Sequence, residues 1–171
     1  MIAADRMPAS LDIVIVNWNT GDALRACLQS IAEGAAGVTL ARVVVVDNAS
    51  TDDSMTRASA VRLPLTVVGN DANRGFGAAC NQGARGSAAD YLLFLNPDTL
   101  LEPDTLARTL AFLESPAQAD VGICGIRLLG DDGLPSTSAA PATRFATVIV
   151  RTAIHASTGG QPADQDIDAL S

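Results

Sequence analysis

Short apolar runs that each end in a polar loop constrain the fold of this chain more than any other feature of its sequence. Four of them follow one another along the first hundred residues, at 11–16, 41–46, 65–68 and 91–95. They are too short to cross a membrane. Their richness in β-branched and aliphatic residues predicts strands that are covered on both faces of a sheet.

Helical patterns separate the four runs. The buried face of the first helix is predicted from residues spaced three and four apart, namely Leu24, Cys27, Leu28 and Ile31. Its expected N-cap is Asn19 or Thr20. A second helix is expected after the turn at 47–54, a third at 78–84, and a fourth with Pro103 at its first position. This alternation predicts one α/β domain with a mostly parallel sheet and helices on both faces.

The pattern is weaker beyond residue 120. Residues 121–129 predict a strand that is kinked at its glycines, whereas 145–154 fits either a helix or a strand. The last residues, 159–171, are polar and acidic, which is typical of disorder.

Composition excludes several classes of protein. The net charge of -8 argues against a nucleic-acid partner, which requires a basic surface. The 171 residues include no lysine, and this excludes a Walker-type phosphate-binding loop. Cys27, Cys80 and Cys124 stand far apart in apolar or helical surroundings, so we expect three reduced thiols rather than a zinc site. Residues 1–10 lack the apolar core of a signal peptide.

Polar residues gather where the predicted strands end. Four loops share this character, and their polar positions are Asn17, Trp18 and Asn19; Asp47 and Asn48; Asn73, Arg74 and Gly75; and Asn96 and Asp98. The carboxyl ends of parallel strands lie at one edge of a sheet, where ligands of open α/β sheets bind. The sequence therefore predicts a binding crevice at this edge.

Each loop offers a different contact. Trp18 presents a flat face on which a nucleobase can stack. The acidic turn at Asp47-Asn48 offers an oxygen that can accept the imide N–H of uracil or thymine. Gly75 allows close approach of the backbone at the start of a helix, where phosphate binds. Arg74 can neutralise a phosphate or brace an aspartate.

Asp98 follows a strand and a proline, and it can bind Mg2+ or Mn2+, which take one or two carboxylates together with phosphate oxygens. A plainer alternative makes it an N-terminal charge of the next helix. Other candidates also have structural alternatives. Trp18 can be a core residue, Asp47 a turn or capping residue, and Asn73 and Asn81 polar groups of turn and helix packing.

Four stretches resemble the inverting family-2 glycosyltransferases of GT-A fold: VIVNWNTGDALRACLQSI, VVVDNASTDDS, NRGFGAACNQGAR and YLLFLNPDTLLEPDTL. They occur in the family's order over about residues 11–129, and the forms VDNASTD and FLNPDT most resemble rhamnosyltransferase-like members. The resemblance implies transfer of a sugar, with rhamnose as one candidate, from a dTDP- or UDP-sugar to a glycan or lipid-linked acceptor. It implies Mg2+ or Mn2+ as cofactor.

The resemblance also implies which residues bind the nucleotide-sugar donor. They are Val16, Asn17, Trp18, Asn19, Asp47, Asn48, Asn73, Arg74, Gly75, Asn81, Asn96 and Asp98, with Asp98 as the metal ligand. Asn96 stands where the family often has an aspartate. The family's catalytic base lies further along the chain, and no residue here is assigned to that role.

We therefore expect a C-terminally truncated GT-A domain, which is either a gene fragment or completed by a second chain or an oligomer. The expected division is a disordered N-terminus at 1–10, a nucleotide-sugar-binding domain at 11–130, a partial acceptor-side segment at 131–158 and a disordered tail at 159–171. We expect a cytoplasmic location, free or at the inner face of the membrane, and a role in cell-envelope polysaccharide synthesis.

Other functions remain as alternatives. A fragment that binds nucleoside diphosphate without catalysis is the main one. Nucleotidyltransferases and phosphoacceptor receiver domains use similar scaffolds, but both depend on a lysine that this sequence lacks.

Overall fold

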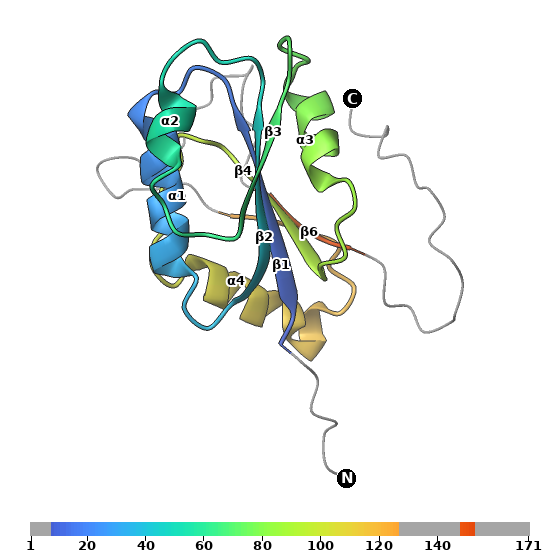
Figure 1. Ribbon diagram of the computed structural model, residues 1–171. Helices are drawn as coiled ribbons and strands as arrows, with labels where there is room; N and C mark the ends of the chain where they lie inside the picture. Colours follow the sequence, from blue (N-terminus) through green and yellow to red (C-terminus); the bar gives the residue numbers. More distant parts are fainter. Residues whose placement is uncertain (1–7, 127–147, 153–171) are drawn as a thin grey trace, which may run out of the picture.

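The computed structural model of the protein describes residues 8–126 and 148–152. Six strands form one sheet in the order β3-β2-β1-β4-β6-β5 (Figure 1). The expected acceptor-side segment lies outside the described residues except at 148–152. Residues 1–7 of the expected N-terminus and the whole expected tail at 159–171 also lie outside them.

The four strands predicted from apolar runs form the parallel part of the sheet. They are β1 (Ser10–Asn17), β2 (Thr39–Asp47), β3 (Leu65–Gly69) and β4 (Tyr91–Leu95). β1 pairs in parallel with both β2 and β4, and β2 pairs in parallel with β3. The α/β class and the mostly parallel sheet are thereby confirmed.

The last two strands are antiparallel additions. β6 (Val148–Arg151) pairs antiparallel with β4, and β5 (Ile123–Gly125) pairs antiparallel with β6. The described part of 145–154 is therefore a strand, and pairing with β4 decides between the two possibilities that the sequence left open. Only 123–125 of the expected strand at 121–129 is β-structure among the described residues.

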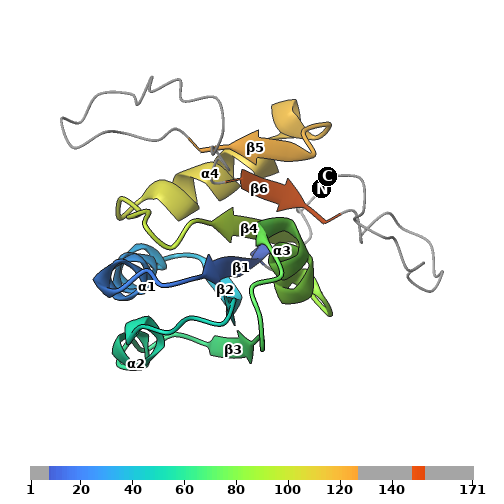
Figure 2. The ribbon, with the colours of Figure 1, turned by 90° about the horizontal axis from the view of Figure 1, so that it is seen from above.

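Helices cover both faces of the sheet, as expected (Figure 2). One face carries α1 (Asp22–Gly34), α2 (Ser54–Ala58) and α4 (Thr105–Glu114), and a short 3-10 turn, η1 (Pro116–Gln118), follows α4. The other face carries α3 (Phe76–Ala84). Side chains of alternating strand residues point to these two layers.

The larger hydrophobic core lies under α1 and α4. The predicted face of α1 is buried there, and the helix and strand residues that meet include Leu24, Leu28, Ile31, Leu106, Leu113, Ile13, Ile15, Val43, Leu93 and Ile149. The smaller core lies under α3, where Val16, Val44 and Val46 pack on Ala79 and Cys80. Small residues let α3 approach the sheet closely.

Three helices begin elsewhere than the sequence predicts. The N-cap of α1 is Gly21, with φ of 56°, and neither Asn19 nor Thr20 caps it. α4 begins at Thr105 after Asp104, because Thr105 N–H donates to the Glu102 carbonyl at 3.0 Å and places Pro103 inside a preceding turn. α3 begins at Phe76, two residues before the expected start.

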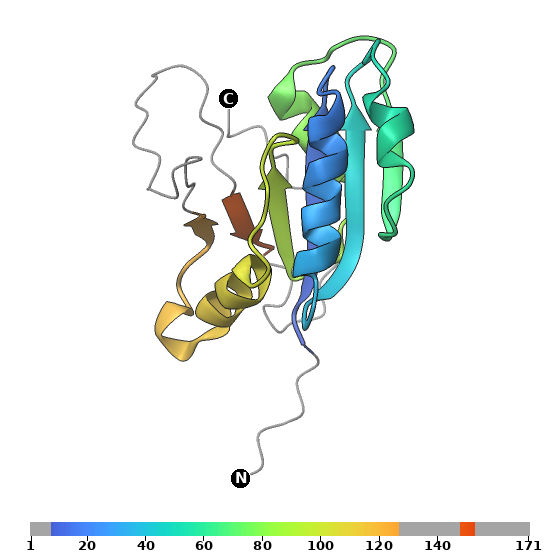
Figure 3. The same ribbon diagram turned by 90° about the vertical axis from the view of Figure 1, so that its left-hand side faces the viewer.

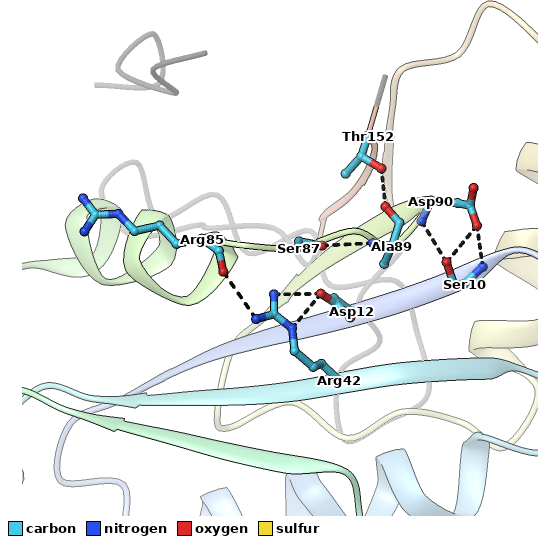
Figure 4. A network of polar contacts seen from close by, with 8 residues as sticks. All are labelled: Ser10, Asp12, Arg42, Arg85, Ser87, Ala89, Asp90 and Thr152. Carbon is cyan, nitrogen blue, oxygen red and sulfur yellow. Dashed lines mark hydrogen bonds and ion pairs between the residues drawn. The ribbon is translucent and has the colours of Figure 1, made fainter. Parts of the chain in front are cut away.

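Polar groups near the amino ends of β1, β2 and β4 hold these strands together (Figure 4). Asp12 is 2% exposed, and its carboxylate pairs with Arg42 at 2.8 Å. The Arg42 guanidinium also donates to the Arg85 carbonyl at 3.3 Å. Asp90 accepts hydrogen bonds from the N–H and the hydroxyl of Ser10, both at 2.8 Å. Ser10 is thereby part of β1 rather than of a disordered terminus.

Two further observations concern the length of the described helices and the three cysteines. The longest described helix, α1, has 13 residues, and none of the helices in the described part is a candidate membrane span. Cys27, Cys80 and Cys124 are all free thiols, and the first two are buried.

Candidate functional site

The polar loops after β1, β2, β3 and β4 gather at one edge of the sheet, because these strands run in parallel. This is the upper edge in Figure 1. The predicted crevice residues therefore come together from four separate parts of the chain. Hydrogen bonds join the loops after β1, β2 and β3 to one another.

Asn17 joins the ends of β1 and β2. Its side chain is 0% exposed, and its Nδ2 donates to Asp47 Oδ1 at 2.8 Å, to Ser54 Oγ at 2.9 Å and to Ser50 Oγ at 3.0 Å. Its Oδ1 accepts from the Thr20 hydroxyl. The side chain offers no surface to a ligand, so Asn17 braces the site from inside. Val16, which is 7% exposed, is likewise a core residue beneath the edge.

Asn19 links the same two loops at the surface. It has a φ of 53°, and its Oδ1 accepts from Thr51 N–H at 2.7 Å and from Asp52 N–H at 3.3 Å. Its own N–H donates to Ser50 Oγ at 3.0 Å. These bonds use the side chain that the sequence assigned to the cap of α1.

Trp18 lies between Asn17 and Asn19, and 56% of it is exposed. Its neighbours on both sides are fixed by hydrogen bonds to the loop after β2. The alternative of a core tryptophan is therefore wrong. An exposed indole held by an anchored backbone is suited to stacking on a flat ligand.

Asp47 is half-buried and forms the turn that the structural alternative predicted. Its Oδ1 accepts from Asn17 and from Ser50 Oγ, the latter at 2.6 Å. Its Oδ2 accepts from Ser50 N–H at 3.3 Å. Oδ2 has this one long hydrogen bond and so retains capacity for a further donor.

Asn48 joins the loops after β2 and β3, and it is 2% exposed. Its Nδ2 donates to Asn73 Oδ1 at 3.1 Å and to the Gly75 carbonyl at 3.3 Å. Its Oδ1 accepts from Asn70 Nδ2 at 2.9 Å and from Arg74 N–H at 3.3 Å. All hydrogen-bonding positions of the amide are occupied, so Asn48 is a second internal brace rather than a surface acceptor.

The segment at Asn73-Arg74-Gly75 leads into α3. Asn73 Oδ1 accepts from Gly75 N–H at 2.9 Å, which is the turn contact expected of asparagine. Gly75 has a φ of 82°, a conformation that favours glycine. Arg74 and Asp71 form an exposed ion pair at 3.1 Å, and the hydrogen bond from Arg74 lowers the pKa of Asp71. An exposed ion pair of this kind contributes little to stability, so Arg74 can leave it and bind an anion.

Asn81 lies further along α3 and is half-buried. Its side chain has no hydrogen-bond partner among the residues that the structure describes. A contact between Asn81 and the donor stays a prediction.

Asp98 stands at the exit of β4 in a turn closed by a bond from Thr99 N–H to the Asn96 carbonyl at 3.2 Å. Its carboxylate is exposed, and within the described residues it has no hydrogen-bond or ion-pair partner. Burial, and to a smaller extent the nearby Asp98 charge, raises the pKa of the Cys27 thiol to about 12. The Cys27 thiol is buried, and its hydrogen donates to the Asn96 carbonyl.

The other acidic side chains of this edge are engaged. Asp52 accepts from Gly21 N–H at 2.8 Å and from the Ser54 hydroxyl at 2.6 Å. Asp22 and Asp53 both pair with Arg57, at 2.6 and 2.7 Å. Asp98 is therefore the carboxylate at this edge with the most capacity for a cation.

No cluster of three or more metal-binding side chains occurs in the part of the chain that the structure describes. One free carboxylate fits a hard cation that takes most of its ligands from phosphate and water. It does not fit a zinc centre built from protein ligands alone.

A shallow groove of about 410 Å³ lies elsewhere, between α1 and the segment that follows α2. Its lining includes Arg25, Gln29, Val61 and Arg62, and no residue from a strand exit contributes to it. The candidate site therefore remains the edge where the four loops meet.

The mostly parallel sheet with helices on both faces matches the fold of GT-A glycosyltransferase structures. The chain belongs to glycosyl transferase family 2, whose family model matches residues 12–155.

Curated relatives match part of this chain. A PGL/p-HBAD biosynthesis glycosyltransferase of Mycobacterium bovis is 34% identical over 113 residues, which are 64% of this chain and 43% of the relative. The succinoglycan biosynthesis protein ExoO of Rhizobium meliloti is 29% identical over 132 residues, which are 77% of this chain and 37% of ExoO. The chain thus spans less than half the length of these relatives.

Solved structures share the fold. A mannosyltransferase of Pyrobaculum calidifontis in complex with GDP-Man and Mn2+ has a TM-score of 0.61 at 25% identity, covering 71% of this chain and 36% of the mannosyltransferase. TarS of S. aureus, residues 1–349 in complex with UDP-GlcNAc, has a TM-score of 0.65 at 21% identity, covering 83% and 45% of the two chains.

Proposed function

We propose that this chain is the donor-binding part of a glycosyltransferase that transfers a sugar from a nucleoside-diphosphate sugar. The observation that carries the proposal is the hydrogen-bonded arrangement of the loops after β1, β2 and β3 around an exposed tryptophan, with an unpaired carboxylate at the exit of β4 on the same edge of the sheet. Trp18 is 56% exposed, and Asp98 has no partner among the described residues. Family membership supports the same reaction class.

The base would bind at the loops after β1 and β2. Trp18 stacks on it, and Asp47 Oδ2 accepts an imide N–H, since its bond from Ser50 N–H is 3.3 Å long. Asn17 and Asn48 act from inside by fixing the two loops. An acceptor for a ring N–H favours UDP or dTDP over ADP, because N1 of adenine carries no hydrogen.

The diphosphate would lie between the start of α3 and the exit of β4. The backbone at Gly75 and the N-terminal end of α3 present partial positive charge to it. Arg74 is exposed and held by a weak surface pair, so a phosphate can recruit it. Asn73, Asn81 and Asn96 complete the polar surroundings of the donor.

Asp98 would hold Mg2+ or Mn2+ together with the donor phosphates. Such an ion, when bound, stabilises negative charge on the departing diphosphate. Transfer with inversion also needs a base for the acceptor hydroxyl, and no described residue at this edge is assigned to it. Residues beyond the described ranges, a second chain or an oligomer would supply it.

The acceptor is a glycan or a lipid-linked molecule, and rhamnose is the sugar favoured by the VDNASTD and FLNPDT motifs. The names of the mycobacterial relative and of ExoO refer to biosynthesis of PGL/p-HBAD and of succinoglycan, and they support a role in envelope polysaccharide synthesis. Such a role fits a cytoplasmic enzyme that works free or at the inner face of the membrane.

A second candidate function is nucleotide binding without catalysis. It is favoured by the engagement of Asp22, Asp47, Asp52 and Asp53 in structural contacts, which leaves no second free carboxylate at their loops. This alternative predicts the same nucleotide affinity but no release of nucleoside diphosphate from any sugar donor.

Calorimetric titration with UDP, dTDP, GDP and ADP, each with and without Mn2+, tests the proposal. We expect UDP or dTDP to bind, and Mn2+ to strengthen binding. Asp98→Asn should weaken binding in the presence of Mn2+ by roughly ten- to a hundredfold, the range for a lost contact to a charged group. Asp120→Asn, which changes an exposed carboxylate after η1, is the matched control.

Release of nucleoside diphosphate from dTDP- and UDP-sugars, in the presence of candidate acceptors, then separates the enzyme from the binding protein. Absence of binding for every nucleotide, with and without Mn2+, would contradict both candidate functions.

A further inference from the structure

One face of α1 contacts the segment that joins β4 to α4 at three places. The contacts come from Cys27, Ser30 and Gly34, which are three and seven residues apart and therefore on one side of the helix. Figure 3 shows α1 next to this segment as it descends from β4 to α4. Asp98 lies within the segment, between the first contact and the second.

The first contact is made at the turn that contains Asp98. Cys27 Sγ lies 3.6 Å from the Asn96 carbonyl oxygen, to which the thiol donates. The same oxygen accepts from Thr99 N–H at 3.2 Å and so closes the turn. Cys27 is 0% exposed, and its position on α1 is therefore fixed by the core.

The second contact is made just after the turn. Leu101 N–H donates to Ser30 Oγ at 3.0 Å, and Ser30 Oγ in turn donates to the Cys27 carbonyl at 2.8 Å. Ser30 and Leu101 are 9% and 8% exposed. A backbone N–H buried at this depth has no water to replace the serine, so the bond determines where the chain can run.

The third contact differs in kind. At Gly34 a Cβ would lie 3.6 Å from the carbonyl oxygens of Glu102 and Pro103, which is ordinary van der Waals contact. The site has room for an alanine. Gly34 therefore lies beside the segment without determining its path, and it provides a control on the same helix face.

We propose that Cys27 and Ser30 are positioning residues for Asp98, which set the place of its carboxylate by holding the chain on both sides of it. This inference rests on the proposed function, in which Asp98 holds a divalent cation against the donor diphosphate. The Asp98 side chain has no partner of its own among the described residues. Its location thus depends on the backbone, and the backbone depends on α1.

A merely structural role for the two side chains predicts something different. Their removal would then lower the melting temperature and leave the effect of Mn2+ on nucleotide binding unchanged. The discriminating quantity is the ratio of the Kd for UDP or dTDP without Mn2+ to the Kd with Mn2+. Asp98 affects this ratio because it is the proposed ligand of Mn2+, and Mn2+ is present in only one of the two Kd measurements.

Calorimetric titration of Cys27→Ala, Ser30→Ala and the double variant measures this ratio. We expect each single change to reduce it by roughly three- to tenfold, the range for one net hydrogen bond, and the double variant to reduce it further. Cys27→Ser retains a donor at the same position and should restore most of the ratio, and it also serves if Cys27→Ala folds poorly. Hydrogen exchange should become faster in the peptide that covers 96–101.

One control removes a comparable group elsewhere, and a second adds a group beside the same segment. Cys80→Ala deletes a buried thiol of α3, on the other face of the sheet. Gly34→Ala adds a methyl group beside the segment that joins β4 to α4. Both should leave the ratio and the exchange at 96–101 within twofold of the wild type.

The outcomes distinguish the two proposals. A normal ratio in the double variant, together with Mn2+-dependent binding in the wild type, would overturn the positioning role alone. If the wild type binds neither UDP nor dTDP, the proposed function is overturned, and the positioning role with it.

Discussion

The side-chain amide of Asn17 donates to the carboxylate of Asp47 across 2.8 Å and thereby joins the last residues of two neighbouring strands. The same amide nitrogen also contacts the hydroxyls of Ser50 and Ser54. Because Asn17 is 0% exposed, water cannot take its place in these contacts. The geometry of the candidate site thus depends on a side chain that is enclosed beneath the surface.

Replacement of Asn17 by alanine should lower the free energy of unfolding by about 1–3 kcal/mol, because it leaves buried polar groups without their donor. Urea denaturation followed by circular dichroism measures the change. Asn81→Ala is the control, since Asn81 is half-buried and without a described partner, and it should change stability by less than about 0.5 kcal/mol. Equal effects of the two variants would contradict the bracing role of Asn17.

Gly83 and Gly34 should respond in opposite ways to alanine. At Gly83 a Cβ would lie 2.5 Å from Val14 Cγ1 and 3.1 Å from Val46 Cγ2, both on buried strands under α3. Gly83→Ala should therefore destabilise the protein by about 1–3 kcal/mol through overpacking. Gly34→Ala has space, and it should be neutral or stabilising by up to about 1 kcal/mol. Thermal melting of the two variants checks the contrast, which fails if both shift the melting temperature alike.

Alkaline pH should destabilise the fold through two buried thiols. Burial raises the pKa of the Cys27 thiol and that of the Cys80 thiol to about 12, from the ordinary value of 9.0. Below about pH 9 both states keep these protons, and above it the unfolded chain releases them while the folded chain retains them. The free energy of unfolding should then fall as pH rises from about 9 towards 12, by up to about 1.4 kcal/mol per pH unit for each thiol.

Denaturation curves at about pH 8, 9.5 and 10.5 measure this slope. The double variant Cys27→Ala/Cys80→Ala lacks both thiols, so its slope should be shallower than that of the wild type. Identical slopes would show that other groups account for alkaline unfolding.

Trp18 should report nucleotide binding directly, since it is the single tryptophan of the sequence. Stacking of a base on the indole is expected to quench its fluorescence. Trp18→Ala should raise the Kd for UDP or dTDP by roughly 5- to 150-fold, which corresponds to the usual range for base stacking. Phe112→Ala removes a 47% exposed aromatic side chain from α4 and should leave the Kd unchanged. An unaltered Kd in Trp18→Ala would place the base elsewhere.

The parallel sheet could be predicted well from the sequence, because each of its strands is a local run of apolar residues. It could not decide the state of 145–154, because β6 exists through its pairing with β4, more than fifty residues earlier in the chain. The start of α4 was placed too early, since Pro103 suits a helix and a turn equally well and the bond from Thr105 to Glu102 selects the turn.

The candidate site shows the same division between local and long-range information. Polar residue types at the strand exits predicted loops that do lie at one edge of the sheet, and a ligand site there stays a prediction. They could not tell the exposed Trp18 from the enclosed Asn17 and Asn48, because the residue type asparagine does not show whether the side chain lies on the surface or inside the protein. Burial of Asn17 follows from Ser50 and Ser54, more than thirty residues away, and Cys27 and Ser30 gave no local sign of their contacts with the segment around Asp98.

The position of β6 between β4 and β5 fixes an order of assembly during synthesis. The four parallel strands are complete once residue 95 has been made, and they can pair as the chain leaves the ribosome. β5 has been made by residue 125, yet its partner in the described sheet ends at residue 151. The edge of β4 that β6 later covers is therefore an open strand edge for as long as translation of the intervening residues takes, and chaperones or other nascent chains can reach it during that interval.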